Sequence, residues 1–292
     1  MSRVLFVGVA FCLAAVAQTS EEGIRQLWNS TFLDKRPPAK KPAAVAKKPA
    51  VYKPVAKTAA ARPASPNDTL LGLTLWLLRK PRPADDPNSR LLILEDDSTT
   101  PAELVPERLE ADSPVQEGDR VRLTVEVPRT GYLYVLDREQ YADGTVSAAY
   151  LIYPNHRTRP GDNAVAGGRV VEIPDQRDKP NHFRVRRSRA DQTAELLSLL
   201  VTSEPLDNIK IGATPLKISE EQFAEWEKKY GVQAERFELS GGAGSTYTSS
   251  EKQAGSSDTA LTQDDPFPQT LYRVSAEPGK PLLLNLPVQI KR

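Results

Sequence analysis

Two histidines are the residues of this chain whose chemistry is most selective, and their surroundings limit what they can do. His156 follows a Pro-Asn dipeptide, and His182 belongs to an alternating run with arginines, so neither lies in an HExxH motif or a cluster of metal ligands. We expect His156 in a surface loop and His182 on the exposed face of a strand. A Ser-His-Asp triad could be assembled on paper, but no Gly-x-Ser-x-Gly elbow marks a nucleophile.

Carboxylates are abundant, since the chain holds 38 aspartates and glutamates, so acidic neighbours say little about acid–base catalysis. This applies to Asp137 with Glu139 and to Asp264 with Asp265. Three aspartates lie at turns around one hairpin and could in principle converge on Ca²⁺: Asp137, Asp143 and Asp162. They form no ligand loop of regular spacing, so we expect solvated turn residues and no metal site.

Two further patterns suggest chemistry by composition alone. Ser240–Thr246 is glycine-rich like a phosphate-binding loop, but it lacks the lysine and the strand-to-helix context of a P-loop. One basic cluster is expected on a solvated strand face, paired with carboxylates of the chain itself: Arg184, Arg186, Arg187 and Arg189. We therefore assign no catalytic, cofactor-binding or metal-binding residues and no cofactor.

The first twenty residues have the order of a secretory signal peptide. Arg3 gives a short positive region, an apolar run follows, and a small-x-small cleavage site ends it, so we expect residues 1–17 to be the signal peptide. A buried N-terminal strand or an uncleaved anchor is the alternative. Cleavage before Gln18 would remove Cys12, the only cysteine, leaving no disulfide and no thiolate. We predict export to the periplasm, the cell surface or the medium, with no transmembrane segment in the mature chain.

Residues 18–34 form a short N-terminal segment, and residues 35–66 are a zone rich in Lys, Pro, Ala and Val. This zone has nine basic residues and no acidic one: Lys35, Arg36, Lys40, Lys41, Lys47, Lys48, Lys53, Lys57 and Arg62. Recurrent proline blocks helix and sheet while like charges repel, so we predict a disordered, semi-rigid tether. The tether could be a solvated spacer, or it could add salt-sensitive attraction to an anionic polymer or membrane surface.

The formal net charge of +1 hides an asymmetry along the chain. Without Arg3 the charge is zero, residues 18–34 contribute −2 and residues 35–66 contribute +9, so residues 67–292 carry −7. A mildly acidic body on a basic stalk has no electrostatic footprint for nucleic acid, and we predict no nucleic-acid partner.

The elements that position these residues belong to one β-rich globular domain over residues 67–292. We expect strands near residues 70–78, 91–95, 119–127, 131–138, 145–153, 169–173, 182–187, 196–203, 235–239, 270–274 and 281–290. Short strands between Pro- and Gly-marked turns are typical of a β-sandwich or a partly open barrel, so the fold class is all-β or mainly β with one short helix. Residues 240–269, rich in Ser, Gly, Thr and Gln, are expected to form a flexible, exposed loop.

The helix is fixed by local signals. Ser219 and Gln222 form a capping box before residues 220–230, and Gly231 fits the end of the helix. Three aromatic residues recur on the face that should pack on the sheet: Phe223, Trp226 and Tyr230.

The strand over 119–127 alternates cleanly. Four aliphatic residues occupy its buried face: Val121, Leu123, Val125 and Val127. Arg122 and Glu126 occupy the opposite face, which we expect to be solvated. The next strand is apolar on both faces and should lie centrally in a sheet, with Tyr134 buried in a strand adjacent to that of Val125.

A series of short motifs carries a family resemblance. In chain order they are Gly118-Asp119, Gly131-Tyr132-Leu133-Tyr134-Val135, Tyr153-Pro154-Asn155, Asn163, Ala166-Gly167 and Ile173-Pro174. Together they resemble the bacterial family called domain of unknown function 4384, best over about residues 118–205. The resemblance implies a β module in an exported or envelope protein, a setting in which such domains are sometimes joined to caspase-like peptidase or protein kinase modules. The family has no established catalytic residues, so it implies no site residue here.

We therefore expect a non-catalytic exported envelope module that binds or scaffolds a partner protein or an anionic surface polymer. One alternative is a carboxylate-dependent hydrolase of cell-wall or extracellular polymer. Another, suggested by the company that the family keeps, is a regulatory accessory to a peptidase or kinase. A deep cleft lined by two facing carboxylates would favour the hydrolase, whereas a flat or aromatic-patched surface would favour binding.

Overall fold

The computed structural model describes residues 23–38, 51–55, 65–93, 102–207, 209–256 and 259–291. The predicted signal peptide and most of the predicted tether lie outside these ranges. None of the helices within them combines the length and the apolar character that crossing a bilayer requires.

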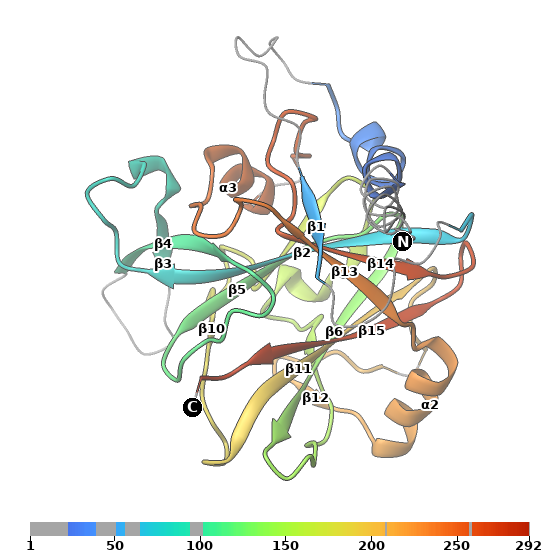
Figure 1. Cartoon of the computed structure of the whole chain (residues 1–292). Helices are drawn as coiled ribbons and strands as arrows, with labels where there is room; N and C mark the ends of the chain where they lie inside the picture. The colour runs from blue at the N-terminus through green and yellow to red at the C-terminus, as the bar shows by residue number, and fades with distance from the viewer. Residues whose placement is uncertain are drawn as a thin grey trace, which may run out of the picture.

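The described residues form two sheets that face each other (Figure 1). The larger sheet has nine strands. Six of them follow one another in the order β1 (Tyr52–Pro54), β13 (Ala234–Leu239), β14 (Thr270–Ser275), β2 (Asp68–Arg79), β4 (Ala102–Leu109) and β3 (Leu91–Ile93). The other three branch from β2: β5 (Arg120–Glu126) pairs with β2, and β9 (Val170–Ile173) and β10 (Phe183–Arg184) pair with β5. The smaller sheet has six: β12 (Leu216–Lys217), β7 (Tyr150–Tyr153), β6 (Gly131–Tyr141), β11 (Gln192–Thr202) and β15 (Leu282–Gln289), with β8 (Ala164–Val165) paired to β6. The sheets are not closed into a barrel, and the prediction of a sandwich-like, all-β fold is confirmed.

Alternating apolar residues of both sheets fill the space between them. The larger sheet contributes, among others, Leu71, Leu73, Leu123, Val125 and Val274, and the smaller one Leu133, Val135, Leu199, Val201 and Leu284. The four aliphatic residues predicted on the buried face of 119–127 are all buried. Removing apolar surface from water contributes roughly 25 cal/mol per Å², so this interface is the main apolar core of the molecule.

The strand after β5 does not pair with it, so the prediction that Tyr134 and Val125 lie in adjacent strands is wrong. Both side chains are buried, but the chain crosses from the larger to the smaller sheet between β5 and β6. A hairpin is excluded because β2, β9 and β10 occupy both edges of β5. Gly131 stands at the crossing, where a Cβ atom would overlap the carbonyl oxygen of Thr202.

The outer face of the smaller sheet is covered by α2 (Glu220–Tyr230), which has the predicted bounds. The Ser219 side chain accepts a hydrogen bond from the Gln222 amide at 3.1 Å, which satisfies one of the free donors at the helix start. Phe223 and Trp226 are buried against a cluster that includes Tyr134. The cover of this sheet is therefore apolar.

Residues 240–269 are not the exposed loop that their composition predicts. They contain α3 (Ser249–Ser256), and Tyr247 is only 2 % exposed. The Tyr247 ring stands edge-on to Trp76, with ring centroids 4.7 Å apart. Its amide donates to the carbonyl of Pro106 at 3.1 Å, so the segment is tied to β4, a strand that sequence patterns did not predict. Backbone pairing with a distant strand, rather than local propensity, orders this segment.

Candidate functional site

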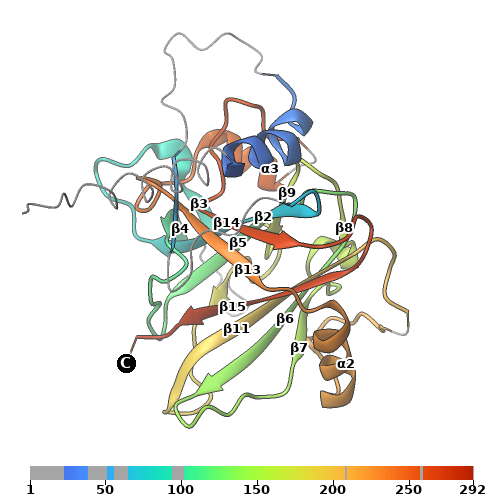
Figure 2. The ribbon, with the colours of Figure 1, turned by 45° about the vertical axis from the view of Figure 1, so that its right-hand side comes forward.

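The outer face of the larger sheet is covered by two separate parts of the chain. Residues 23–38, which we call the N-terminal strap, begin with helical residues 23–31, and α3 lies on the same side of the sheet (Figure 2). In this strap, Ile24 and Trp28 are buried in one cluster with Phe237 of β13. The covers bury a face that β-strand alternation alone would leave in water.

Two pieces of the predicted tether belong to this folded body, so the prediction of disorder over 35–66 is wrong at both. Arg36 is 1 % exposed, and Tyr52–Pro54 forms β1 at the edge of the larger sheet. The Tyr52 hydroxyl donates to the carbonyl of Pro268 at 2.7 Å. Proline and lysine content describes local preferences, and it cannot report partners that lie some two hundred residues away in the chain. Residues 39–50 and 56–64 lie outside the described residues.

Arg122 and Glu126 point away from the inner core as predicted, but they are not solvated. Their exposed fractions are 1 % and 4 %. Arg122 is paired with Glu172 at 2.8 Å, and Glu126 is paired with Arg36 at 2.8 Å. Since a buried charge is tolerated only when it is paired and hydrogen-bonded, the covering segments turn this face into a layer of ion pairs.

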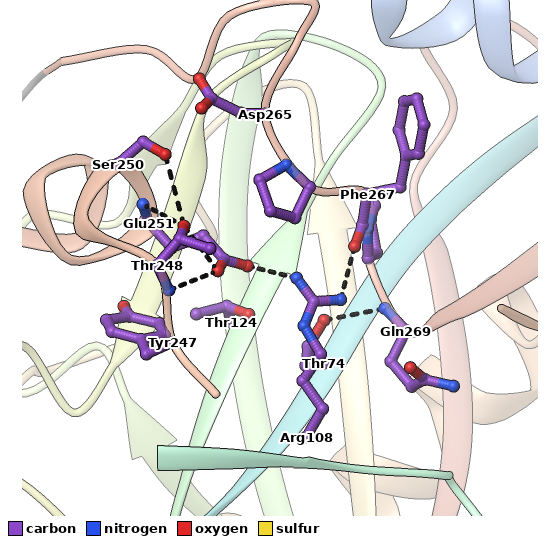
Figure 3. A network of polar contacts seen from close by, with 12 residues as sticks. Thr74, Arg108, Thr124, Tyr247, Thr248, Ser250, Glu251, Asp265, Phe267 and Gln269 are labelled. Atoms are coloured by element: carbon purple, nitrogen blue, oxygen red, sulfur yellow. Dashed lines mark hydrogen bonds and ion pairs between the residues drawn. The ribbon is translucent and has the colours of Figure 1, made fainter. Parts of the chain in front are cut away.

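A third ion pair on this face joins Arg108 of β4 to Glu251 of α3 (Figure 3). The same guanidinium donates to the carbonyl of Phe267 at 2.6 Å and lies 5.0 Å from the ring centroid of Trp76. The second carboxylate oxygen of Glu251 accepts from the amide of Thr248 at 2.9 Å. Both oxygens of Glu251 are thus committed to anchoring α3.

A cleft of about 860 Å³ opens between the N-terminal strap and the glycine-rich turn before Tyr247. Its apolar lining is Ile24, Trp28, Leu33, Val51, Tyr52, Leu239, Pro266 and Phe267. Gly241 exposes main chain along one side, where a Cβ atom would meet nothing within 4 Å. The indole N–H of Trp28 is buried and has no hydrogen-bond partner among the described residues. This cleft is the candidate binding site.

A second, more polar cavity of about 510 Å³ lies beside β9. Its lining includes Arg159, Asp162, Asp175 and Arg177. Arg159 is paired with Asp162 at 3.6 Å, and Arg177 with Asp175 at 2.9 Å. The lining also holds Arg169 and Glu172, so it has three cationic and three anionic side chains and no excess formal charge for a ligand.

The two histidines lie in different surroundings. His156 is exposed in a turn, as predicted. His182 is 5 % exposed, so its predicted place on a solvated strand face is wrong. β10 begins only at Phe183, and the preceding Asn181 donates its side-chain amide to the carbonyl of Leu92 at 2.8 Å, which draws this part of the chain inward.

The structure gathers acidic residues that the sequence did not distinguish. Asp137 of β6 lies beside Glu195 of β11, and Glu139 lies across from Glu195 in the register of these strands. Burial raises the pKa of Asp137 to about 6. Burial and the neighbouring charge of Asp137 raise the pKa of Glu195 to about 8. None of the three lines either cavity described above.

The remaining candidates do not converge on a site. Asp143 accepts from the Thr145 amide at 2.9 Å, and Asp162 lies on a different turn, beside Arg159. Within the described ranges no three His, Cys, Asp or Glu side chains are grouped to hold a metal ion. Asp264 and Asp265 both line the cleft, where Asp265 accepts from the Thr262 amide at 2.6 Å.

The basic cluster and the glycine-rich loop have structural roles. Arg189 is paired with Asp191 at 2.8 Å, as the expectation of internal pairing requires, while Arg187 donates to main-chain carbonyls and Arg184 and Arg186 are exposed. The loop over residues 240–246 is no phosphate cradle, because it continues into the segment that pairs with β4.

Residues 114–197 match the family model described as domain of unknown function (DUF4384). The resemblance seen in the sequence is confirmed. No curated protein and no solved structure is significantly similar to the chain. The matched stretch supplies strands to both sheets, whereas every residue that lines the cleft lies outside it.

The cleft residues were missed by sequence reasoning, because they come from four parts of the chain. A signal existed in the strap, where Trp28 and Phe32 stand four residues apart on one helical face and stack with centroids 4.6 Å apart. No local pattern joins these residues to Arg108 or to Phe267.

Proposed function

We propose that the protein is a non-catalytic binding module of the bacterial cell envelope, and that its cleft holds an apolar segment of a partner protein. The cleft itself carries the proposal. Its volume of about 860 Å³, its eight apolar side chains and exposed polar groups such as Asn29 have the character of a ligand site, in which apolar walls supply affinity and a few polar groups fix orientation.

The carboxylates of the cleft support binding over hydrolysis. Two of the three carboxylates that line the cleft are engaged, with Asp264 as the third. Glu251 is held by Arg108 and Thr248, and Asp265 accepts hydrogen bonds from both the amide and the hydroxyl of Thr262. The acidic pair with raised pKa values, Asp137 and Glu195, lines neither cavity. A general acid must reach its substrate, so these positions favour binding.

The charges of the cleft favour a polypeptide over a polyanion. Arg25 of the strap is exposed and Asp264 is half-buried, and both line the cleft. The lining also holds Asp265 and the Arg108–Glu251 ion pair, so the cleft has charges of both signs with a small acidic excess. Such a lining suits a peptide segment with its own mixed polar groups, whereas a polyanion would be repelled by the acidic excess. A signal-peptide pattern over residues 1–17 supports export, which would bring the cleft to envelope proteins.

The test uses one substitution that fills the cleft and one matched control on the same helix. The chain from Gln18 is immobilised, an envelope protein that it captures is purified, and the Kd is measured for each variant. Asn29 and Gln26 are both exposed, but only Asn29 lines the cleft. We expect Asn29→Trp to raise the Kd about tenfold or more, and Gln26→Trp to leave the Kd within about twofold of the natural chain.

Three outcomes would contradict the proposal. Equal Kd values for the two variants would place the partner elsewhere on the surface. Binding of an anionic polymer that falls with salt and ignores Asn29→Trp would identify a polymer-binding protein. Hydrolysis of peptidoglycan or polysaccharide that one Asp or Glu substitution abolishes would identify an enzyme.

A further inference from the structure

Arg36 of the strap is held in a socket made entirely by distant parts of the chain. Its side chain has no exposed surface, and one terminal nitrogen donates to both carboxylate oxygens of Glu126, at 2.8 and 2.9 Å. The other terminal nitrogen faces the carbonyls of Asp265 and Pro266, at 3.3 and 3.2 Å. The two terminal nitrogens of a planar guanidinium serve the carboxylate and the carbonyls separately, whereas the single nitrogen of an ammonium group would have to serve both.

The residues beside Arg36 are recognised as well. The Gln263 amide donates to the carbonyl of Pro37 at 3.0 Å, and its side chain donates to the carbonyl of Arg36 at 3.3 Å. Lys35 donates to the carbonyl of Pro128 and lies across Gly167, where a Cβ atom would come within 2.8 Å of the lysine side chain. The socket therefore contacts both the side chains and the main chain of the sequence Lys-Arg-Pro.

The strap contacts the socket without becoming part of either sheet. Residues 23–38 add no strand to either sheet, and their contacts with the body are made by side chains and by main-chain carbonyls. Glu126 is 4 % exposed, and Arg36 is the ion-pair partner that the described residues offer it. A buried carboxylate without its partner is strongly unfavourable, so the socket has a strong preference for an occupant with a guanidinium group.

We propose that this socket is a peptide-recognition site for the Lys35-Arg36-Pro37 sequence, and that a second copy of the chain can supply the occupant. Every copy carries both the strap and the socket, and exchange of an identical element preserves each contact. An exchanged strap would also bring Ile24, Trp28 and Leu33, so each cleft would then be lined partly by the other copy. The inference does not depend on what the cleft binds.

The first test mixes two full-length variants that are each defective on one side. Arg36→Ala has an intact socket and a defective strap, and Glu126→Gln has the reverse. We expect a heterodimer in sedimentation analysis of the mixture. The matched mixture of Arg36→Ala with the double variant Arg36→Ala/Glu126→Gln should contain none. Circular dichroism confirms that each variant is folded, and the absence of a heterodimer from folded variants would overturn exchange between copies.

The second test does not rely on destabilised variants. A specific protease site is inserted between Pro38 and Val51 of the full chain, the chain is cut, and a labelled peptide of residues 23–38 competes for the socket. The expected result is displacement of the cut strap by the natural peptide, competition about a hundredfold weaker by the Arg36→Ala peptide, and competition within about threefold of natural by Gln26→Ala, at an exposed position that does not line the cleft. Equal competition by the two variant peptides, or loss of the cut strap without competitor at micromolar concentrations, would overturn recognition by the socket.

Discussion

The two faces of the larger sheet are buried in opposite ways. The inner face packs apolar side chains such as Leu123 and Val125 against the smaller sheet. The outer face buries Arg122, Glu126 and Arg108 under the strap and α3, with each charge in an ion pair. Period-two alternation correctly separates the two faces, but it cannot tell a solvated polar face from a covered one.

The difference has an energetic meaning. Apolar burial stabilises in proportion to area, whereas a buried ion pair only offsets the cost of removing two charges from water. The inner face therefore supplies the driving force for folding. The outer face supplies specificity, because only the correct covering segment brings the matching charge.

The largest effect is expected where one member of an outer-face pair is removed. Arg122→Ala leaves Glu172 buried without its cation and should lower the free energy of unfolding by about 3–5 kcal/mol, measured by urea denaturation. The control Arg184→Ala, at an exposed position of β10, should stay within about 0.5 kcal/mol. A change at Arg122 as small as the control would mean that this face is solvated after all.

On the inner face, Leu123→Ala should lower the free energy of unfolding by about 2–5 kcal/mol through lost burial and a cavity.

The same urea experiment on the double variant Arg122→Met/Glu172→Met sharpens the comparison. Since apolar replacements of a buried pair are often neutral or better, the double variant should be more stable than Arg122→Ala. A double variant less stable than Arg122→Ala would contradict the view that the ion pair only offsets the cost of its own burial.

A smaller, pH-dependent effect is expected from the acidic residues on β6 and β11 of the smaller sheet. Folding raises the pKa of Glu195 from 4.5 to about 8, so the folded state holds the proton more tightly than the unfolded state. The free energy of unfolding should therefore fall as pH rises from about 4.5 to 8. The full pKa difference corresponds to about 4.8 kcal/mol, but Glu195 is only half-buried and water screens its charge, so we expect a change on the order of 1–2 kcal/mol from this group. Glu195→Gln should remove that part of the slope, and Glu117→Gln, at an exposed position, should not. Identical slopes for the two variants would refute the assignment.

The smallest effect concerns the apolar cover of the smaller sheet. Ser219→Ala removes the hydrogen bond that the side chain accepts from the Gln222 amide, and it should lower thermal stability by about 1 kcal/mol. Ser30→Ala, at an exposed helical position of the strap, is a matched control that should have less effect. A loss of stability in Ser219→Ala no greater than that in Ser30→Ala would show that the cap does not contribute.

How far the sequence predicts this molecule depends on the range of the signal. α2 was predicted to the residue because its cap, its aromatic face and its end are all local. β4 was missed because Pro106 interrupts the expected strand pattern, although the strand lies within the larger sheet. The cleft and the socket depend on contacts such as Arg36 with Glu126, ninety residues apart, which no local pattern records.

The bounds of the family match have one further consequence. Residues 114–197 include β5 and β6 but exclude β2 and β15, which pair with β5 and β11. A fragment cut at these bounds would expose Leu123 and Val135 to water and leave two sheets without their neighbouring strands. The recognisable signature is therefore smaller than the cooperative folding unit, and it contains none of the residues that line the cleft.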